Sequence, residues 1–268
     1  MEFKVGDYVT RNSYQNDLIF RITKIKDDIY YLTGVNIRLC ADSNVEDLKK
    51  CDRNSDSEDV EFIKNIEMTN LNRDDYFYLP GKILHIDADS EYLERCLKYY
   101  EKSNIWAAGI LESEKNIPNK IEKLLEEYRP DIVVITGHDA YYKKSGEISD
   151  LNSYKNSCYY VEAIKNARKY EKTAEIPKYY ALFALMWEKY EKSHEKLIII
   201  AGGCQSDYEE LIKAGANFAS SPKRINIHAL DPAIIASKLS LSDVTQDIDL
   251  KGILEKIIKN EKIRRITT

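Results

Sequence analysis

The chain has 268 residues, a formal net charge of −5 and 43% hydrophobic side chains, which suffices for a large α/β domain together with a small one. The slightly acidic balance gives no sign of nucleic-acid binding, and no apolar run approaches the roughly 20 residues that span a bilayer. The first residues, MEFKVGDY, lack the apolar core of a signal peptide, so we expect a cytoplasmic protein that binds neither nucleic acid nor membrane.

Residues 1–45 are expected to form a small β domain. Four runs rich in β-branched and aromatic residues are separated by turn-forming residues: VGDYVTR, DLIFRITKI, DIYYLTGV and IRLCA. This pattern predicts an SH3-like β-barrel, and a hairpin appended to the main domain is the alternative. Residues 46–80 are polar and acidic, which indicates a linker or a mobile loop.

Residues 81–268 alternate between apolar strand-like runs and amphipathic helical runs. This alternation predicts an α/β domain with a mostly parallel sheet and helices on both faces, of the caspase-like or flavodoxin-like type. The expected strands are KILHIDAD, IWAAGIL, DIVVITG, LIIIAGG, ANFAS and INIHAL. Ser90 is the expected N-cap of the first helix, and a later helix over 207–214 should end at Gly215.

Two further helical segments are expected in this domain. Residues 173–194 are predicted to add a core helix, with a lid or an interface segment as the alternative. Residues 249–260 are predicted to form a last helix before a charged tail.

Two strands of this domain end in similar sequences. DIVVITGHD places His138 directly after a glycine, and LIIIAGGCQ does the same for Cys204. Because chemistry in open parallel sheets collects beyond the carboxyl ends of the strands, neighbouring strands would bring these two residues together. A thiolate nucleophile and an imidazole general acid–base would then form a catalytic pair. A structural cysteine and an unrelated histidine are the alternative, but the shared position behind a glycine favours the pair.

The residues around the predicted pair suit attack on a carbonyl. The start of the helix over 207–214 would favour a thiolate. The turns at Gly137 and Gly203 offer backbone N–H groups that would stabilise an oxyanion. Four polar residues near these strands are candidates for substrate binding: Asp139, Gln205, Ser220 and Ser221. Of these, Asp139 lies directly beside the pair and would favour a basic side chain in the substrate.

Neither the cysteines nor the acidic residues predict a metal site or a cofactor. The five cysteines are odd in number and form no CxxC pair, so we expect no disulfide framework and no zinc knuckle. Asp87 and Asp89 follow the first strand of the α/β domain, as the magnesium-binding acids of a phosphoacceptor receiver domain do. That interpretation ranks second, because Thr136, Gly137 and His138 stand where the phosphoacceptor aspartate is expected.

Several long stretches resemble the YabG family of sporulation-specific peptidases, and together they span most of the chain. They are FKVGDYVTRNSY, GVNIRLCADS, GKILHIDAD, PDIVVITGHDAYYKK and AGGCQSDYEELIKAGANFASSPKRINIHALDPAIIA. The resemblance implies a cysteine peptidase with His138 and Cys204 as catalytic residues, which cuts spore coat and coat-associated proteins beside arginine. It also implies synthesis in the mother cell of a sporulating bacterium, with association to the spore coat as a further option.

The order of histidine and cysteine, each after an apolar strand, also resembles the caspase, legumain and gingipain type of cysteine peptidase. In that type a glycine follows the histidine, whereas here Asp139 follows His138, which puts the usual oxyanion donor in question. A preference for arginine would make Arg264 and Arg265 in the tail a self-cleavage site. The alternative function is a non-catalytic receiver-like or scaffold module of the spore coat, and the sequence leaves the oligomeric state open.

Overall fold

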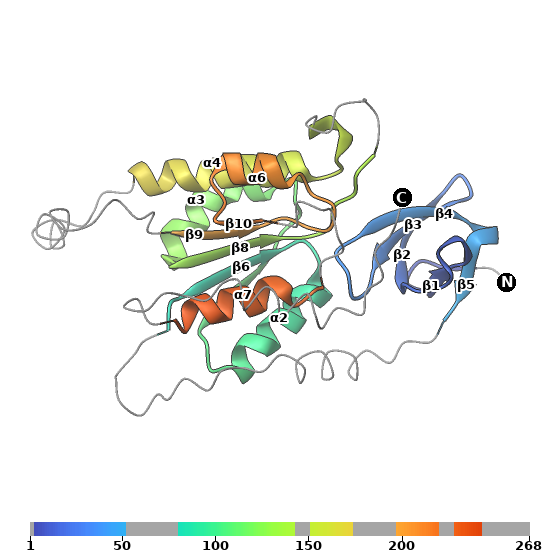
Figure 1. Ribbon diagram of the computed structural model, residues 1–268, viewed down its shortest axis with the longest axis horizontal. Helices are drawn as coiled ribbons and strands as arrows, with labels where there is room; N and C mark the ends of the chain where they lie inside the picture. The colour runs from blue at the N-terminus through green and yellow to red at the C-terminus, as the bar shows by residue number, and fades with distance from the viewer. Residues whose placement is uncertain (1–2, 52–79, 143–150, 174–196, 220–227, 243–268) are drawn as a thin grey trace, which may run out of the picture.

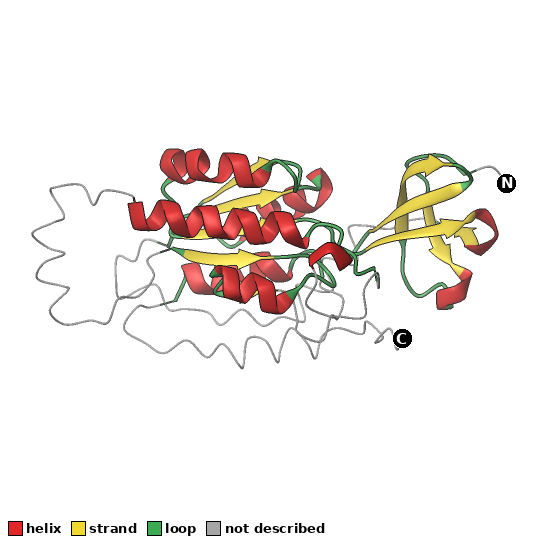
Figure 2. Cartoon of the chain, turned by 90° about the horizontal axis from the view of Figure 1, so that it is seen from above, coloured by secondary structure: helices red, strands yellow, loops and turns green. Residues whose placement is uncertain are grey.

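The computed structural model describes residues 3–51, 80–142, 151–173, 197–219 and 228–242. These residues form two five-stranded sheets, one antiparallel and near the N-terminus, the other parallel and flanked by helices (Figure 1). Figure 2 shows the antiparallel unit at one end of the long axis, beside the helix-covered parallel sheet. Within the described ranges, no helix is long and apolar enough to cross a membrane.

Five parallel strands form the larger sheet: β6 Ile83–Asp87, β7 Ala107–Leu111, β8 Ile132–Thr136, β9 Ile198–Ala201 and β10 Phe218–Ala219. Their order is β10-β9-β8-β6-β7, and every neighbouring pair is parallel, as predicted. Numbered within this sheet, the order is 2-1-3-4-5, as in flavodoxin-like doubly wound sheets. The winding reverses between β6 and β8, where such sheets bind ligands. The caspase-like type stays a prediction.

Helices cover both faces of the parallel sheet, as predicted (Figure 1). One face carries α2 Ser90–Lys102 and α7 Asp231–Ser240; the other carries α3 Ile117–Tyr128, α4 Ser157–Thr173 and α6 Tyr208–Ala214. Successive side chains of a strand point to opposite sides of the sheet, so alternate residues of β8 pack against the helices on its two faces. Val133 and Ile135 pack in the cluster of α3, α4 and α6, whereas Ile132 and Val134 pack with α2 and α7.

The helix ends follow from their capping residues. Asp89, and not the predicted Ser90, caps α2, because Asp89 keeps an extended backbone and its carboxylate accepts from the N–H groups of Glu91 and Tyr92. Asp207 caps α6 in the same way by accepting from the N–H of Glu210. The same helix is followed by Gly215 in the left-handed conformation, so its predicted end is confirmed.

The antiparallel sheet consists of β1 Tyr8–Arg11, β2 Phe20–Lys26, β3 Ile29–Gly34, β4 Cys40–Asn44 and β5 Leu48–Lys50. Short 3-10 helices are η1 Asn12–Tyr14, η2 Val45–Asp47 and, in the α/β domain, η4 Leu151–Ser153. The strand order is β4-β3-β2-β1-β5, and β5 lies in the range expected to begin the linker. The β domain near the N-terminus is therefore an antiparallel sheet, and its closure into an SH3-like barrel stays a prediction.

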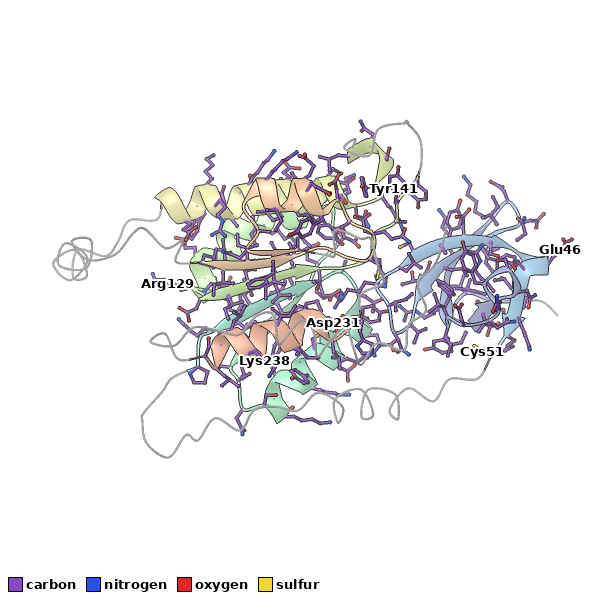
Figure 3. The ribbon with its side chains drawn as sticks, in the orientation of Figure 1. Glu46, Cys51, Arg129, Tyr141, Asp231 and Lys238 are labelled. Atoms are coloured by element: carbon purple, nitrogen blue, oxygen red, sulfur yellow. The ribbon has the colours of Figure 1, made fainter. Side chains whose placement is uncertain are left out.

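The loop between β3 and β4 joins the two units. Ile37 and Leu39 of this loop pack in one hydrophobic cluster with Cys204, which belongs to the α/β domain. Figure 3 shows Tyr141, on the loop after β8, on the side facing the antiparallel unit, with Arg129 at the opposite end of the domain. The antiparallel unit thus covers the carboxyl edge of the parallel sheet.

Several predicted features lie outside the described residues. They are the helices over 173–194, apart from the end of α4, and over 249–260, the substrate-binding candidates Ser220 and Ser221, and the tail residues Arg264 and Arg265. Of the strand expected at INIHAL, the structure describes only residues 228–230, where His228 forms an isolated antiparallel bridge with Ile37.

Candidate active site

The structure brings His138 and Cys204 to the same edge of the parallel sheet. β8 and β9 are neighbours, and their last paired residues are Ile135 and Ala201. The N–H of Gly202 continues this ladder by donating to the carbonyl oxygen of Ile135 at 3.0 Å. His138 and Cys204 therefore stand at matching positions beyond the ends of two adjacent strands.

Glycines allow the two strand-end loops to touch through their backbones. A β-carbon on Gly203 would lie 2.7 Å from the carbonyl oxygen of Gly137 and 3.0 Å from the nitrogen of Asp139. On Gly137 it would lie 2.8 Å from the carboxylate of Glu114. A side chain at Gly203 would thus push the cysteine loop away from the histidine loop, whereas one at Gly137 would push the histidine loop away from Glu114. The N–H of Gly203 donates to the hydroxyl of Ser206 at 2.9 Å.

His138 is buried and electrically neutral near neutral pH. Burial lowers its pKa to about 4, because removal from water disfavours the imidazolium, and the positive charge of Arg38 acts in the same direction. Its ring lies against Tyr92, with the ring centroids 4.9 Å apart. The Nε2 atom is buried and has no hydrogen-bond partner among the described residues. A neutral imidazole with an unpaired nitrogen is able to accept a proton.

The backbone of His138 is held in place from two sides. Its N–H donates to Glu114 at 3.2 Å, and its carbonyl oxygen accepts from the side-chain amide of Asn156 at 2.6 Å. Burial raises the pKa of Glu114, which lies on the loop before α3. Sequence reasoning overlooked both residues, because nothing in their local pattern distinguishes them from ordinary loop residues.

Asp139 links the histidine loop to the cysteine loop. Its side chain is fully buried and accepts four hydrogen bonds, two at each oxygen. The donors are the N–H groups of Ala140 and Asn156 and the hydroxyls of Ser157 and Ser206. Burial raises the pKa of this carboxyl, although the hydrogen bonds oppose the change. Its predicted contact with a basic substrate side chain stays a prediction, and all its described contacts are internal.

The other substrate-binding candidate within the described residues is Gln205. It follows Cys204 with a left-handed backbone, at φ 61°. Its side-chain oxygen accepts from the N–H of Tyr141 at 3.3 Å, so it bridges the two strand-end loops. Gln205 therefore lies at the predicted edge, beside the candidate nucleophile.

Sequence reasoning missed a second feature of this edge, which is a buried ion pair. The guanidinium of Arg38 donates to the carboxylate of Asp87 at 2.7 Å, and both side chains are fully buried. Burial alone would raise the pKa of Asp87, but the charge of Arg38 outweighs it and holds that pKa well below its usual range. The guanidinium also donates to the carbonyl oxygen of Ala229 at 3.0 Å and lies 4.9 Å from the ring centroid of Tyr92.

Asp87 and Asp89 have protein partners, unlike the paired acids of a receiver domain. Asp87 binds Arg38, and Asp89 caps α2 while pairing with Arg21 at 3.0 Å. Among the described residues, no group of three or more histidine, cysteine, aspartate or glutamate side chains is placed to hold a metal ion. The position of Asp87 at a strand end was the one signal in the sequence for the ion pair.

The chain was compared with known proteins. The family model of YabG peptidase U57 matches residues 4–178 and 175–263. The sporulation-specific protease YabG of Bacillus subtilis (strain 168) is 39% identical over 290 aligned residues, which cover 98% of this chain and 93% of that protein. No solved structure matches the chain significantly.

Proposed function

Since this chain belongs to the YabG family of peptidases, we propose that it is a cysteine endopeptidase with Cys204 as nucleophile and His138 as general acid–base. The observation that carries the proposal is the placement of these residues at matching positions beyond β8 and β9. Gly203 lets the loop of Cys204 approach the backbone of the His138 loop more closely than a residue with a β-carbon would. The relative's name supports a role in sporulation.

The proposed reaction uses only groups of the chain, the substrate and water. His138, which is neutral at pH 7, accepts the thiol proton as the sulfur of Cys204 attacks the carbonyl carbon of the scissile bond. The oxyanion that forms is stabilised by the N–H of Cys204. His138 then gives the proton to the leaving amine as the C–N bond breaks, which leaves a thioester. Water, deprotonated by His138, hydrolyses the thioester and restores the thiol.

The finer points of the proposal come from the family resemblance. The substrates are spore coat and coat-associated proteins in the mother cell, and the enzyme cuts beside arginine. The buried carboxylate of Asp87 at this edge of the sheet supports the choice of a cationic substrate side chain, because a cationic partner offsets the cost of burying a negative charge. Self-cleavage at Arg264 or Arg265 remains part of the proposal.

The test is cleavage of an arginine-containing peptide by the wild type, Cys204→Ala and His138→Ala. We expect both variants to lose at least about 100-fold in kcat/KM while circular dichroism shows that they stay folded. Cys158→Ala is the matched control, because Cys158 is an exposed cysteine on α4. Cleavage by Cys204→Ala at the wild-type rate would disprove the mechanism.

A further inference from the structure

The loop between β3 and β4 lies across the candidate site and turns tightly at Arg38, where the N–H of Leu39 donates to the carbonyl oxygen of Ile37 at 2.8 Å. Three main-chain hydrogen bonds join this segment to the α/β domain, and two of them lie at its ends. The carbonyl oxygen of Asn36 accepts from the N–H of Ala229 at 3.0 Å, and the N–H of Cys40 donates to the carbonyl oxygen of Asp139 at 3.3 Å. Ile37 forms a bridge with His228, and Leu39 forms one with Asp139. Main-chain pairing of this kind lets a protein hold a peptide segment independently of its side chains.

The third contact places one peptide bond of the loop at the candidate nucleophile. The N–H of Cys204 donates to the carbonyl oxygen of Arg38 at 3.0 Å. In the proposed mechanism this N–H stabilises the oxyanion, so the carbonyl that it holds is that of the residue before the scissile bond. Leu39 pairs with Asp139, next to His138, on the side where the amine would leave. Arg38 therefore occupies the place of the substrate residue whose carbonyl is attacked.

The side chain of Arg38 enters an enclosed pocket with the chemistry of an arginine site. One guanidinium nitrogen donates to Asp87 and another to the carbonyl oxygen of Ala229, while Tyr92 lies 4.9 Å away at its ring centroid. The carboxylate matches the charge of a guanidinium, the carboxylate and the carbonyl accept from its two terminal nitrogens, and the ring lies near its flat face. The Nε atom of Arg38 is buried and has no hydrogen-bond partner among the described residues. A lysine ammonium has three N–H donors on one nitrogen, so it does not reproduce two hydrogen bonds that two separate nitrogens make in a fixed plane.

We propose that this pocket selects the arginine of substrates, with Asp87 as the selecting carboxylate, and that Arg38 fills it as a substrate mimic built into the chain. The inference rests on the proposed function and deepens it. It also places the described structure in a closed state, because a substrate arginine and Arg38 require the same space. The loop must leave the pocket before a substrate binds.

The loop is held closed by side chains of α2. The one hydroxyl proton of Tyr92 is shared between the carbonyl oxygens of Gly34 and, at 2.9 Å, of Ile37. The guanidinium of Arg95 donates to the carbonyl oxygen of Val35 at 2.8 Å. Cys204 beneath the loop is fully buried, so reagents of peptide size have no path to its sulfur while the loop is in place.

The first test asks whether Arg38 blocks the site. A peptidyl-arginine chloromethyl ketone alkylates a cysteine nucleophile, and peptide mass mapping locates the adduct. We expect Arg38→Ala to be alkylated at Cys204 at least about tenfold faster than the wild type, because the pocket is then empty. Arg21→Ala is the matched control, since Arg21 also links the two units through an aspartate but lies outside the pocket. Arg38→Ala reacting at the wild-type rate would overturn the blocking role.

The second test asks whether Asp87 selects arginine. Arg38→Ala is compared with Arg38→Ala/Asp87→Asn, a pair in which the second change removes a carboxylate that the first has left without its arginine partner. The readout is the ratio of kcat/KM for an arginine peptide to that for the same peptide with citrulline, which has the same shape and no charge. We expect a ratio of about 100 or more for Arg38→Ala and a ratio near 1 for the double variant. An unchanged ratio would overturn the assignment of Asp87.

Two further measurements test the proposal if Arg38→Ala does not fold or if no peptide is cleaved. Arg38→Lys keeps a cation beside Asp87 and serves if Arg38→Ala fails to fold; it too should be alkylated faster than the wild type, and an equal rate would count against the proposal. Calorimetric binding of N-acetylarginine amide to Arg38→Ala, lost in the double variant, tests the pocket without catalysis. If no protein cleaves peptide through Cys204, the proposed function fails, and this binding still decides the pocket. If cleavage needs Cys204 but ignores Arg38 and Asp87, only the present inference fails.

Discussion

The main-chain N–H of Cys204 donates a hydrogen bond to the carbonyl oxygen of Arg38, at an N···O distance of 3.0 Å. The two residues lie on loops that adjoin different sheets, and this bond and the Arg38–Asp87 ion pair join the two units at the candidate active site. Arg38, Asp87 and Cys204 therefore affect both the stability of the interface between the two units and the access of reagents to the thiol, and both properties can be measured on the same variants.

The Arg38–Asp87 pair should behave as a coupled buried pair in urea unfolding. Arg38→Met or Asp87→Leu alone leaves a buried charge without its partner, so each should lower the free energy of unfolding by about 3–5 kcal/mol. The double variant should lose less than either single variant, because no charge is then buried. The partly exposed Arg11–Asp47 pair is the control, and its loss should cost no more than about 1 kcal/mol. Additive losses at Arg38 and Asp87 would contradict the coupling.

His138 should make the folded state less stable in mild acid. Its pKa is about 4 when folded, against 6.5 for an ordinary histidine, so below pH 6.5 the unfolded chain takes up a proton that the folded chain does not. This contribution to stability is complete above pH 6.5 and is lost as the pH falls towards 4, by on the order of 3 kcal/mol.

The measurement for His138 is urea unfolding of the wild type and His138→Ala at several pH values between 7.5 and 4.5. The variant should lose stability less steeply than the wild type over this range. The same slope in both proteins would show that His138 takes up its proton as readily in the folded chain as in the unfolded one.

Asp139→Asn separates two roles for this carboxylate. Because Asp139 accepts four internal hydrogen bonds that connect the loops of His138 and Cys204, we expect the variant to lower kcat for arginine and citrulline peptides by the same factor, about tenfold or more. Direct contact with the substrate would instead lower cleavage of the arginine peptide alone. Asp17→Asn, at an exposed position, is the control and should leave both rates unchanged.

Gly203→Ala should damage the site through backbone contact alone. Its β-carbon would lie 2.7 Å from the carbonyl oxygen of Gly137, so the loops carrying Cys204 and His138 have to separate. We expect a loss of about 1–3 kcal/mol in the free energy of unfolding and at least tenfold in activity. Gly81→Ala is the control, because there the nearest atom is 3.5 Å away. Equal thermal unfolding midpoints for the two variants would refute the close approach.

The sequence by itself determined the layered α/β domain and the position of the candidate pair. Buried parallel strands read as short apolar runs, and the glycines behind His138 and Cys204 mark the turns at their ends, so local pattern carries this information. Local chemistry also predicted the end of α6 at Gly215. The prediction that Ser90 caps α2 was wrong. Asp89 and Ser90 are both good N-cap residues, and Asp89 is the cap because its backbone is extended.

Only the tertiary structure decided what lies opposite the pair. The loop that carries Arg38 comes from a separate sheet, and the pairing of residues so far apart along the chain leaves no periodic signal in either segment. From the sequence, Asp87 is a strand-end acid and Asp139 a candidate for binding a basic substrate side chain. The structure adds Arg38 beside Asp87 and four internal hydrogen-bond donors around Asp139. Burial and partner, which set the charge and role of both carboxylates, are properties of the packed molecule.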